Sequence, residues 1–228
     1  MLWQVTLPTP FPPQFPASWE PVHLRRLRIF TLTAGQPALD RVNHPACHAA
    51  AELGWRLVEG TASAAAITEC NTALRAAWEA TIGAYRYYEA PAELWGLSRL
   101  VDVLALLFSE PIGAARHLIV PLSFYHLGEP VPLLTPEETQ VCCGLFRDIF
   151  GDRGAFLTPP WWQESWRTGT AVSLAARMYE SRDFSTMPIL ADALQDTGCD
   201  NDDILAHCRG PEPHVRGCWV VDLVLGKG

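Results

Sequence analysis

Charged side chains are scarce in this sequence, and basic ones are scarcer than acidic ones. Only 18% of the 228 residues are charged, and 17 lysines and arginines stand against 25 aspartates and glutamates, for a net charge of −8. Nucleic acids and anionic membranes are bound through clustered lysine and arginine, so we expect neither as a partner. Disorder requires low hydrophobicity, whereas 49% of this chain is hydrophobic, so most of it is expected to fold.

Long apolar runs are missing as well. The longest, around 104–108, is far shorter than the roughly 20 residues that a membrane-spanning helix needs. No basic segment precedes an apolar one near the start, so no secretory signal is expected. The seven cysteines are an odd number, and two of them are adjacent. Together these features favour a cytoplasmic protein with free thiols.

The sequence also lacks the common catalytic signatures. It contains no glycine-rich phosphate loop, no H-E-x-x-H, no G-x-S-x-G and no Cys-x-x-Cys pair. Catalytic groups can come from distant segments, so the sequence leaves the question of an enzyme open, with the balance against one.

Proline is concentrated at one end of the chain. Six prolines occupy positions 8, 10, 12, 13, 16 and 21. Because proline fixes φ and removes a donor, we expect an extended arm over 1–21, with a polyproline ligand for a partner as the alternative. The remainder, 22–228, is expected to be a single helical domain, with 22–130 and 131–228 as its sub-halves.

Apolar residues recur at helical spacing through the first half of this domain. The spacing predicts helices over 44–59, 63–89, 97–108 and 111–127. The helix over 63–89 is expected to bury a stripe made of Ile67, Cys70, Leu74, Trp78, Ile82 and Tyr85. The helix over 97–108 is apolar almost all round, which is typical of a helix in the middle of a bundle.

Start and stop signals mark further helices in the second half. Thr135 and Glu138 form a capping-box pattern ahead of a helix that runs to residue 150. Another helix is predicted over 165–181, and a further one, capped by Ser185 or Thr186, ends at the glycine of position 198. The segment 218–226 is rich in β-branched residues. It is predicted as a helix, with a strand as the alternative, because a lone strand would have no partner.

These elements predict the all-α class, as an irregular bundle of about eight to ten helices with an extended proline-rich N-terminal arm. Two charged features are expected on its surface. The cluster RRLR at 25–28 is interpreted as the solvated face of a helix. Asp222 is interpreted as marking the wet face of the last helix, with a buried pair to Arg209 or Arg216 as the alternative.

The second half contains CGLFRDIFG and then WRTGTAVSLAARMYESRDFSTMPILADALQDTGCDNDDILAHCRGPEPHVRGCWVVDLVLGKG. In order and spacing, these segments of about 85 residues resemble the C-terminal region of a paralogous family of uncharacterised planctomycete bacterial proteins. LRRLRIF and HAAAELGWRLVEGTASAAAI resemble that family's N-terminal region. Family members follow the basic helix with a cysteine-rich, arginine-containing stretch, where this chain has TLTAGQPALDR. The resemblance implies a helical module in a bacterial cytoplasm and no established activity.

The stretch CDNDDILAHCRGPEPHVRGCW at 199–219 holds the most chemistry-bearing side chains. Its leading interpretation is two helices joined by a rigid turn. Asp200 is expected to cap the first helix, with Asp203 in its first turn. Gly210 is expected to end that helix in the left-handed conformation, ahead of two prolines.

Zinc is the sharper alternative for this stretch. The candidate ligands are Cys199, His207, Cys208, His214 and Cys218, and the last four are taken as the ligand set. They form none of the C-x2-4-C or H-x3-5-H pairs of structural zinc sites. His207 and Cys208 are also about 100° apart on a helix, which hinders binding of one ion by both. A third interpretation is a thiol nucleophile, Cys208 or Cys218, activated by a nearby histidine.

The leading functional prediction is a non-enzymatic module that binds a protein or peptide. Tryptophans and polar side chains of the C-terminal half are the candidate binding residues: Trp161, Trp162, His207, Arg209, His214, Arg216 and Trp219. Arg209, His214 and Arg216 are expected to ring an apolar groove. No cofactor is expected under this hypothesis. The alternative is a small metal- or thiol-dependent enzyme that uses residues 199–218, with zinc as the cofactor.

Overall fold

The structure, a computed structural model, describes residues 21–81, 92–109, 111–119, 125–126, 129–130, 133–151, 162–211 and 213–227. In these ranges the chain forms eleven α-helices, one 3-10 helix and two strands of two residues each. The all-α class is therefore confirmed, with slightly more helices than expected. The predicted arm lies outside the described residues, apart from Pro21, where the first helix begins. No helix in the described ranges is long and apolar enough to cross a bilayer.

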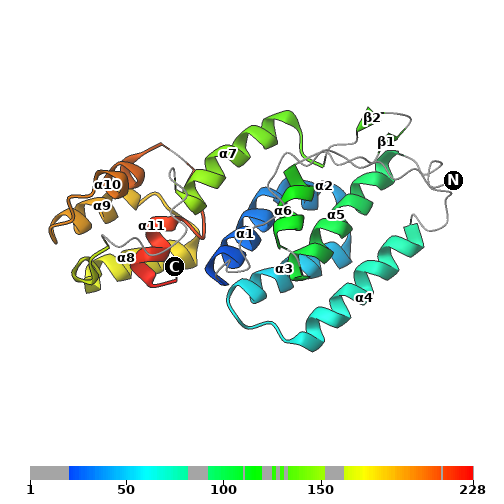
Figure 1. Cartoon of the computed structure of the whole chain (residues 1–228), viewed down its shortest axis with the longest axis horizontal. Coiled ribbons are helices and arrows are strands. Elements are labelled where there is room, and N and C mark those ends of the chain that lie inside the picture. The colour runs from blue at the N-terminus through cyan, green and yellow to red at the C-terminus, as the bar shows by residue number, and fades with distance from the viewer. Residues whose placement is uncertain are drawn as a thin grey trace, which may run out of the picture.

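The elements follow one another in a simple order (Figure 1). The first six helices are α1 (Pro21–Ala34), α2 (Gln36–Val42), α3 (Pro45–Val58), α4 (Ala64–Thr81), α5 (Ala92–Ser109) and α6 (Pro111–Ile119). The two strands, β1 (Tyr125–His126) and β2 (Glu129–Pro130), pair antiparallel. The remaining elements are α7 (Pro136–Phe150), the 3-10 helix η1 (Glu164–Trp166), α8 (Gly169–Ser181), α9 (Met187–Gln195), α10 (Asp202–Arg209) and α11 (Trp219–Leu225).

Local signals set several of these helix ends. At the start of α7, the Thr135 hydroxyl accepts from the Glu138 N–H at 3.2 Å, and the Glu138 carboxylate accepts from the Thr135 N–H at 2.8 Å. The capping box is therefore confirmed. The segment 218–226 is a helix, as predicted, and Gly226 ends it in the left-handed conformation with φ of 68°.

Other predicted ends differ from the structure. Of the helix expected over 111–127, the described residues Pro111–Ile119 form α6, whereas Tyr125 and His126 lie in a strand. The helix expected over 165–181 begins as the 3-10 helix η1, and α8 starts only after the Thr168 cap. In the predicted stripe of α4, Leu74 is buried and Ile67, Cys70 and Trp78 are partly buried, whereas Ile82 and Tyr85 lie outside the described residues.

Two separate hydrophobic cores divide the chain. The first surrounds α5, which packs against α3, α4 and α6 as expected of a helix that is apolar all round. Its buried apolar residues on α5 are Leu97, Leu100, Val101, Val103, Leu104, Leu107 and Phe108. The second core is built by α8, α9, α10 and α11.

The helix α7 belongs to the first core, although it extends toward the second group of helices (Figure 1). Leu145, Ile149 and Phe150 are buried on it and join the first core. The buried residues of the first core extend to Phe150, and those of the second core begin at Trp166. We call the described residues of 21–151 the first unit and those of 162–227 the second unit.

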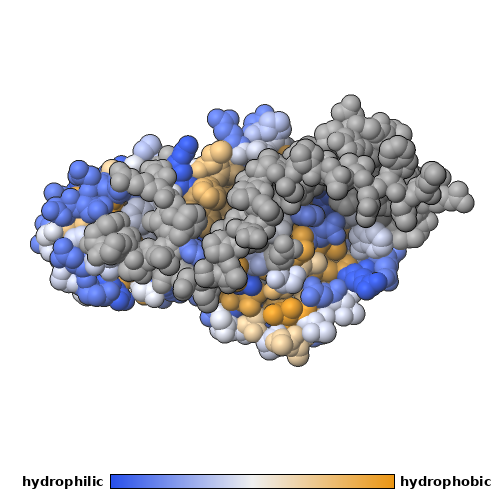
Figure 2. Space-filling model, in the orientation of Figure 1, coloured by the Kyte–Doolittle hydropathy of each residue, from blue (hydrophilic) through white to orange (hydrophobic). Residues whose placement is uncertain are grey.

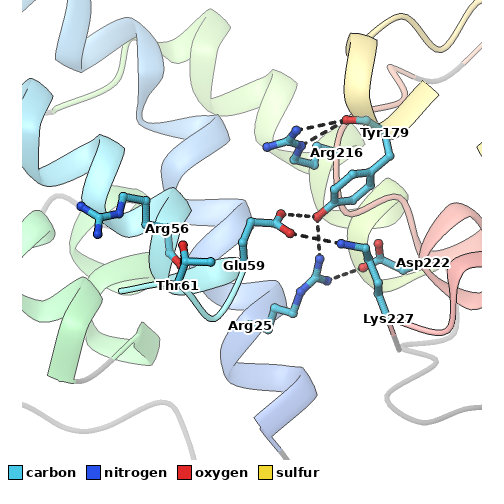
Figure 3. Close-up of polar contacts among 8 residues, drawn as sticks. All are labelled: Arg25, Arg56, Glu59, Thr61, Tyr179, Arg216, Asp222 and Lys227. Atoms are coloured by element: carbon cyan, nitrogen blue, oxygen red, sulfur yellow. Dashed lines mark hydrogen bonds and ion pairs between the residues drawn. The ribbon is translucent and has the colours of Figure 1, made fainter. Parts of the chain in front are cut away.

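A chain of polar contacts joins the two units (Figure 3). We call its five residues the junction network: Arg25, Glu59, Tyr179, Asp222 and Lys227. Arg25 lies 2.5 Å from Asp222 and donates to the Tyr179 hydroxyl at 2.8 Å. That hydroxyl donates to Glu59 at 2.6 Å, and Lys227 donates to Glu59 at 3.1 Å. Arg25 and Glu59 belong to the first unit, and the other three residues of the network belong to the second.

The junction network corrects two predictions about surface charge. The cluster at 25–28 is not a solvated face, because Arg26 is 1% exposed and the Arg25 side chain 16%. Asp222 is fully buried rather than on a wet face, and its partner is Arg25 rather than Arg209 or Arg216. The physical reason is that a buried charge is stable only beside an opposite charge, and Arg25 and Asp222 provide this for each other.

Candidate metal centre

Four side chains from three places in the sequence converge near the boundary between the units. Asp148 comes from the last turn of α7, and His207 from the last turn of α10. His214 and Cys218 come from the turn that connects α10 to α11. One potential ligand atom from each of the four lies within 4.8 Å of all the others. We call this group the Asp-His-His-Cys cluster.

The caps of α10 position His207. Asn201, not the predicted Asp200, is the N-cap, and its side chain accepts from the Ile204 N–H at 3.0 Å. Gly210 does not adopt the predicted left-handed conformation, because its φ is −69° and its ψ is 160°. The reason is the next residue, Pro211, since a proline pushes the residue before it toward extended conformations.

The turn after α10 brings His214 and Cys218 to the same place without forming a helix. Gly217 has a φ of 94°, a conformation that favours glycine. A Cβ at this position would lie 2.8 Å from Cγ2 of Ile29, so the turn lies directly against α1. The Val215 N–H donates to Oδ2 of Asp148 at 2.8 Å, which ties the turn to α7.

The contacts within the cluster meet at one place. Nε2 of His207 lies 3.2 Å from Sγ of Cys218 and 3.2 Å from Oδ1 of Asp148. Nδ1 of His214 lies 2.8 Å from the same Oδ1. A Cys-His-Asp catalytic relay uses the two different nitrogens of its histidine, one toward the thiol and one toward the carboxylate. Here a single nitrogen faces both groups, which is the arrangement of ligands around a common point.

The surroundings shift the pKa of Asp148 and the pKa of Cys218 in opposite directions. Burial alone would raise the pKa of Asp148, but the hydrogen bonds from His207 and His214 outweigh it, so the pKa lies below its usual 3.8. Burial raises the pKa of Cys218 well above its usual 9.0, and the negative charge of Asp148 adds to this rise. Without a bound cation the thiol therefore stays protonated, while the carboxylate stays charged.

One polar atom of the cluster has no partner. Nε2 of His214 is buried and makes no hydrogen bond within the described part of the chain. The His214 side chain is only 7% exposed and that of His207 only 11%. Nδ1, the other nitrogen of this buried ring, is the one that faces Asp148 and the common point of the cluster.

The donor set and spacing fit zinc. A tetrahedral zinc ion with bonds of 2.0–2.3 Å has donor atoms roughly 3.3–3.6 Å apart. The three short contacts, at 2.8 to 3.2 Å, lie just below this spacing, and no ligand pair exceeds 4.8 Å. The four donor atoms therefore lie at a spacing close to that of a zinc site.

The remaining residues of the sequence-predicted zinc set and groove lie elsewhere. Cys208 is fully buried in the second core and is absent from the cluster, as its angle of about 100° from His207 on the helix indicates. Arg209 donates to Asp192 and Gln195 on α9. Each of the three side chains expected to ring a groove contacts different partners.

Arg216 and the tryptophans also contact groups within the chain. The Arg216 guanidinium donates to the Tyr179 carbonyl at 3.2 Å and lies over the Trp55 ring at 5.7 Å. Trp219 packs against His207 with ring centroids 5.3 Å apart. Trp162 packs on Trp166, an edge contact at 5.4 Å. The remaining tryptophan of the predicted set, at position 161, lies outside the described residues.

Sequence reasoning missed Asp148. A signal was present, because an aspartate in the last turn of a helix faces the negative end of the helix dipole. In α7 this aspartate is flanked by Arg147 and the buried Ile149. An acidic group in such a position needs compensation from elsewhere, and the two histidines supply it.

Within the described ranges, this cluster is the one group of three or more His, Cys, Asp and Glu side chains close enough to share an ion. No protein-family model, curated protein or solved structure matches the chain. What the protein does is therefore inferred from its own residues.

Proposed function

We propose that the chain binds one transition-metal ion, zinc by its donor set, in the Asp-His-His-Cys cluster, and that the ion has a structural role. The observation that carries this proposal is the convergence of four ligand atoms within 4.8 Å of one another. Three of the four come from the stretch of residues 199–219 that the zinc hypothesis singled out, and Asp148 replaces Cys208 in the set.

The ligand types select the kind of ion. Two imidazoles and a thiol are donors that suit zinc and its neighbours among the transition metals. Calcium and magnesium prefer six or more oxygen ligands, whereas this cluster offers one carboxylate. Cobalt(II), which accepts the same donors, is a useful spectroscopic substitute.

The number and burial of the ligands favour a structural site over a catalytic one. Catalytic zinc usually keeps one position open for water, whereas structural zinc has four protein ligands. Asp148 and Cys218 are fully buried. A buried thiol with a raised pKa is also poorly suited to act as a free nucleophile.

Each residue has a distinct task in this proposal. His207 would bind through Nε2 and His214 through Nδ1, the atoms that already face Asp148. Asp148 would bind through Oδ1, while Val215 holds Oδ2. Cys218 would bind as thiolate and lose its proton to solvent, because a metal ion stabilises the charged form.

A protein or peptide partner stays a prediction. Arg209, His214 and Arg216 contact groups within the chain, so exposed hydrophobic side chains elsewhere are a further candidate for the surface that binds a partner. Figure 2 shows a mainly hydrophilic surface over α8, α9 and α10, whereas hydrophobic side chains come to the surface beside α7 and among the first-unit helices. Val141 and Phe146 of α7 are 54% and 44% exposed. Co-purification from the native host tests this prediction, and a reducing, cytoplasmic setting would suit both roles.

The metal proposal is tested with the full chain. Protein freed of metal by a chelator is titrated with zinc in the presence of a colorimetric chelator, and cobalt spectra report thiolate ligation. We expect about one equivalent of zinc per chain. Asp148→Asn, His207→Gln and Cys218→Ser should each weaken binding by at least tenfold, the lower end of losses seen even for groups outside the ligand shell.

Two matched variants serve as controls. His48 is partly exposed and contacts Asn43, and Cys143 is exposed, so His48→Gln and Cys143→Ser should bind zinc like the unaltered chain. Circular dichroism checks that every variant is folded. Equal zinc binding by Cys218→Ser and Cys143→Ser would overturn the proposal.

A further inference from the structure

The Asp-His-His-Cys cluster takes its ligands from both units. Asp148 lies on α7, whose neighbouring side chains belong to the first core. The other three ligands belong to the second unit, and Cys218 is part of the second core. A bound ion would therefore be coordinated by side chains of both units at once and would link them.

Many of the other contacts between the units are polar, although Val215 packs on the first core and Gly217 lies against Ile29. The two cores do not merge, and the junction network consists of charged residues and one tyrosine. Lys227 and Glu59 are 33% and 31% exposed, so water and salt weaken that pair. Polar interfaces between packed units are the ones at which relative motion is the default expectation.

We infer that metal occupancy controls how firmly the second unit is docked on the first, so that the ion acts as a clamp. This inference rests on the proposed function. A full ligand set exists only in the docked arrangement, because Asp148 leaves the cluster when the units separate. An ion that binds the docked state more tightly shifts the equilibrium toward that state.

The helix α11 connects the ion site to the junction network. Cys218 is the N-cap of α11, and Asp222 lies one turn further along. The Asp222 N–H donates to the Cys218 carbonyl at 2.9 Å. Fixing the Cys218 sulfur therefore also fixes the position from which Asp222 reaches Arg25. The effect of the ion should thus extend to residues that do not touch it.

One residue of the junction network, Lys227, can report chemically on separation of the two units. Lys227 is the single lysine of the chain. Its ammonium pairs with Glu59 and lies 4.1 Å from the centre of the Tyr179 ring. The contact with Glu59, which lies in the first unit, is lost when the units separate, so the amine then becomes more reactive toward acylating reagents.

The experiment measures the rate of Lys227 acylation in the full chain, with and without one equivalent of zinc. Short pulses of an acetylating reagent are followed by peptide mass spectrometry, with an added single-lysine peptide as the reagent standard. We expect zinc to slow the reaction by about fivefold or more, the lower end of ordinary coupling between two sites. Cys218→Ser should show no zinc effect, whereas Cys143→Ser should behave like the unaltered chain.

Buried thiols distinguish docking from overall stabilisation. Cys47 lies in the first core and Cys199 in the second, and both are buried. Their reaction with a thiol reagent reports unfolding of each unit, and zinc should leave both rates nearly unchanged. Slowing of both thiols to the same extent as Lys227 would mean general stabilisation and would overturn the clamp.

The remaining outcomes separate the two proposals. Zinc that binds with one equivalent and leaves the Lys227 rate unchanged overturns the clamp, while the metal-binding function stands. Failure of the chain to bind zinc overturns the proposed function and the clamp with it.

Discussion

The Arg25 guanidinium lies 2.5 Å from the Asp222 carboxylate, although 197 positions separate the two residues in the chain. The pair joins the first described helix, α1, to the last, α11. Asp222 is fully buried, and its Oδ1 has no hydrogen-bond partner among the described residues. Burial raises the pKa of Asp222, and the charge of Arg25 opposes this rise. The carboxylate therefore depends on nearby cations, first of all Arg25, to stay ionised.

Removal of one member of this pair should destabilise the protein strongly. Arg25→Met leaves a buried carboxylate without its hydrogen-bonded counter-charge, which typically costs about 3–5 kcal/mol in free energy of unfolding. Urea unfolding provides the measurement. The exposed pair of Arg75 and Glu79 is the control, since Arg75→Met should change stability by only about 0.5 kcal/mol. Similar losses in the two variants would contradict the assigned role of Arg25.

Gly217→Ala should disturb both the turn and the ion site. The φ of 94° disfavours a Cβ, and this Cβ would lie 2.8 Å from Ile29. We expect a loss of about 1–2 kcal/mol from backbone strain and a further 1–3 kcal/mol or so from overpacking. Zinc affinity should fall as well, because His214 and Cys218 flank the glycine.

Gly198→Ala is the matched control for this effect. Gly198 has a φ of 87°, but nothing lies within 4 Å of a Cβ placed there. This variant should show the backbone strain alone and retain its affinity for zinc. Equal losses of zinc affinity in both variants would show that contact with Ile29 does not position the ligands.

Glu59 should give the junction network a defined acid sensitivity. Burial tends to raise the pKa of Glu59, but hydrogen bonds from Tyr179 and Lys227 outweigh it, so the pKa lies below its usual 4.5. A carboxylate with a lowered folded-state pKa contributes stability above its unfolded-state pKa, and this is lost as the pH falls through the folded value.

The measurement is the free energy of unfolding between neutral pH and pH values below 4.5. In Glu59→Gln the decline on acidification should be shallower than in the unaltered chain. Asp40→Asn, at an exposed site with a local contact to Gln36, should leave the decline unchanged. A Glu59→Gln curve parallel to that of the unaltered chain would contradict the prediction.

The seven cysteines should react in an order set by exposure. Cys143 is exposed and Cys70 partly so, whereas the other five are buried. Burial raises the pKa of Cys208 to about 12 and that of Cys218 well above its usual value. A thiol reagent at neutral pH should therefore modify Cys143 first, which peptide mass spectrometry can follow. Rapid labelling of Cys218 would instead favour the thiol-dependent alternative.

Local chemistry made much of the helical content predictable. The capping box at Thr135 and Glu138 uses residues three positions apart, so the sequence contains the whole interaction. The same holds for the apolar character of α5. Helix ends were less predictable: Asn201 rather than Asp200 caps α10, because neighbouring residues offer nearly equal capping oxygens. The fold around them decides which one is used.

The candidate site was predictable only in part. The stretch that contains His207, His214 and Cys218 stands out by composition, but Asp148 lies 66 positions before His214. Spacing rules for zinc ligands apply to ligands on one local motif, and they do not find a carboxylate supplied by another helix. Cys208, next to His207 in the sequence, lies outside the cluster, because sequence proximity does not imply a shared direction.

The sequence by itself determined the class of the fold, most helix positions and the region that holds the candidate ligands. These properties depend on periodicity, caps and turn residues, which act over a few positions. The tertiary structure alone decided that Arg25 meets Asp222 and that Asp148 joins the two histidines and Cys218. Such contacts arise when packing brings distant segments together, and buried charges then require partners whatever their separation in the chain.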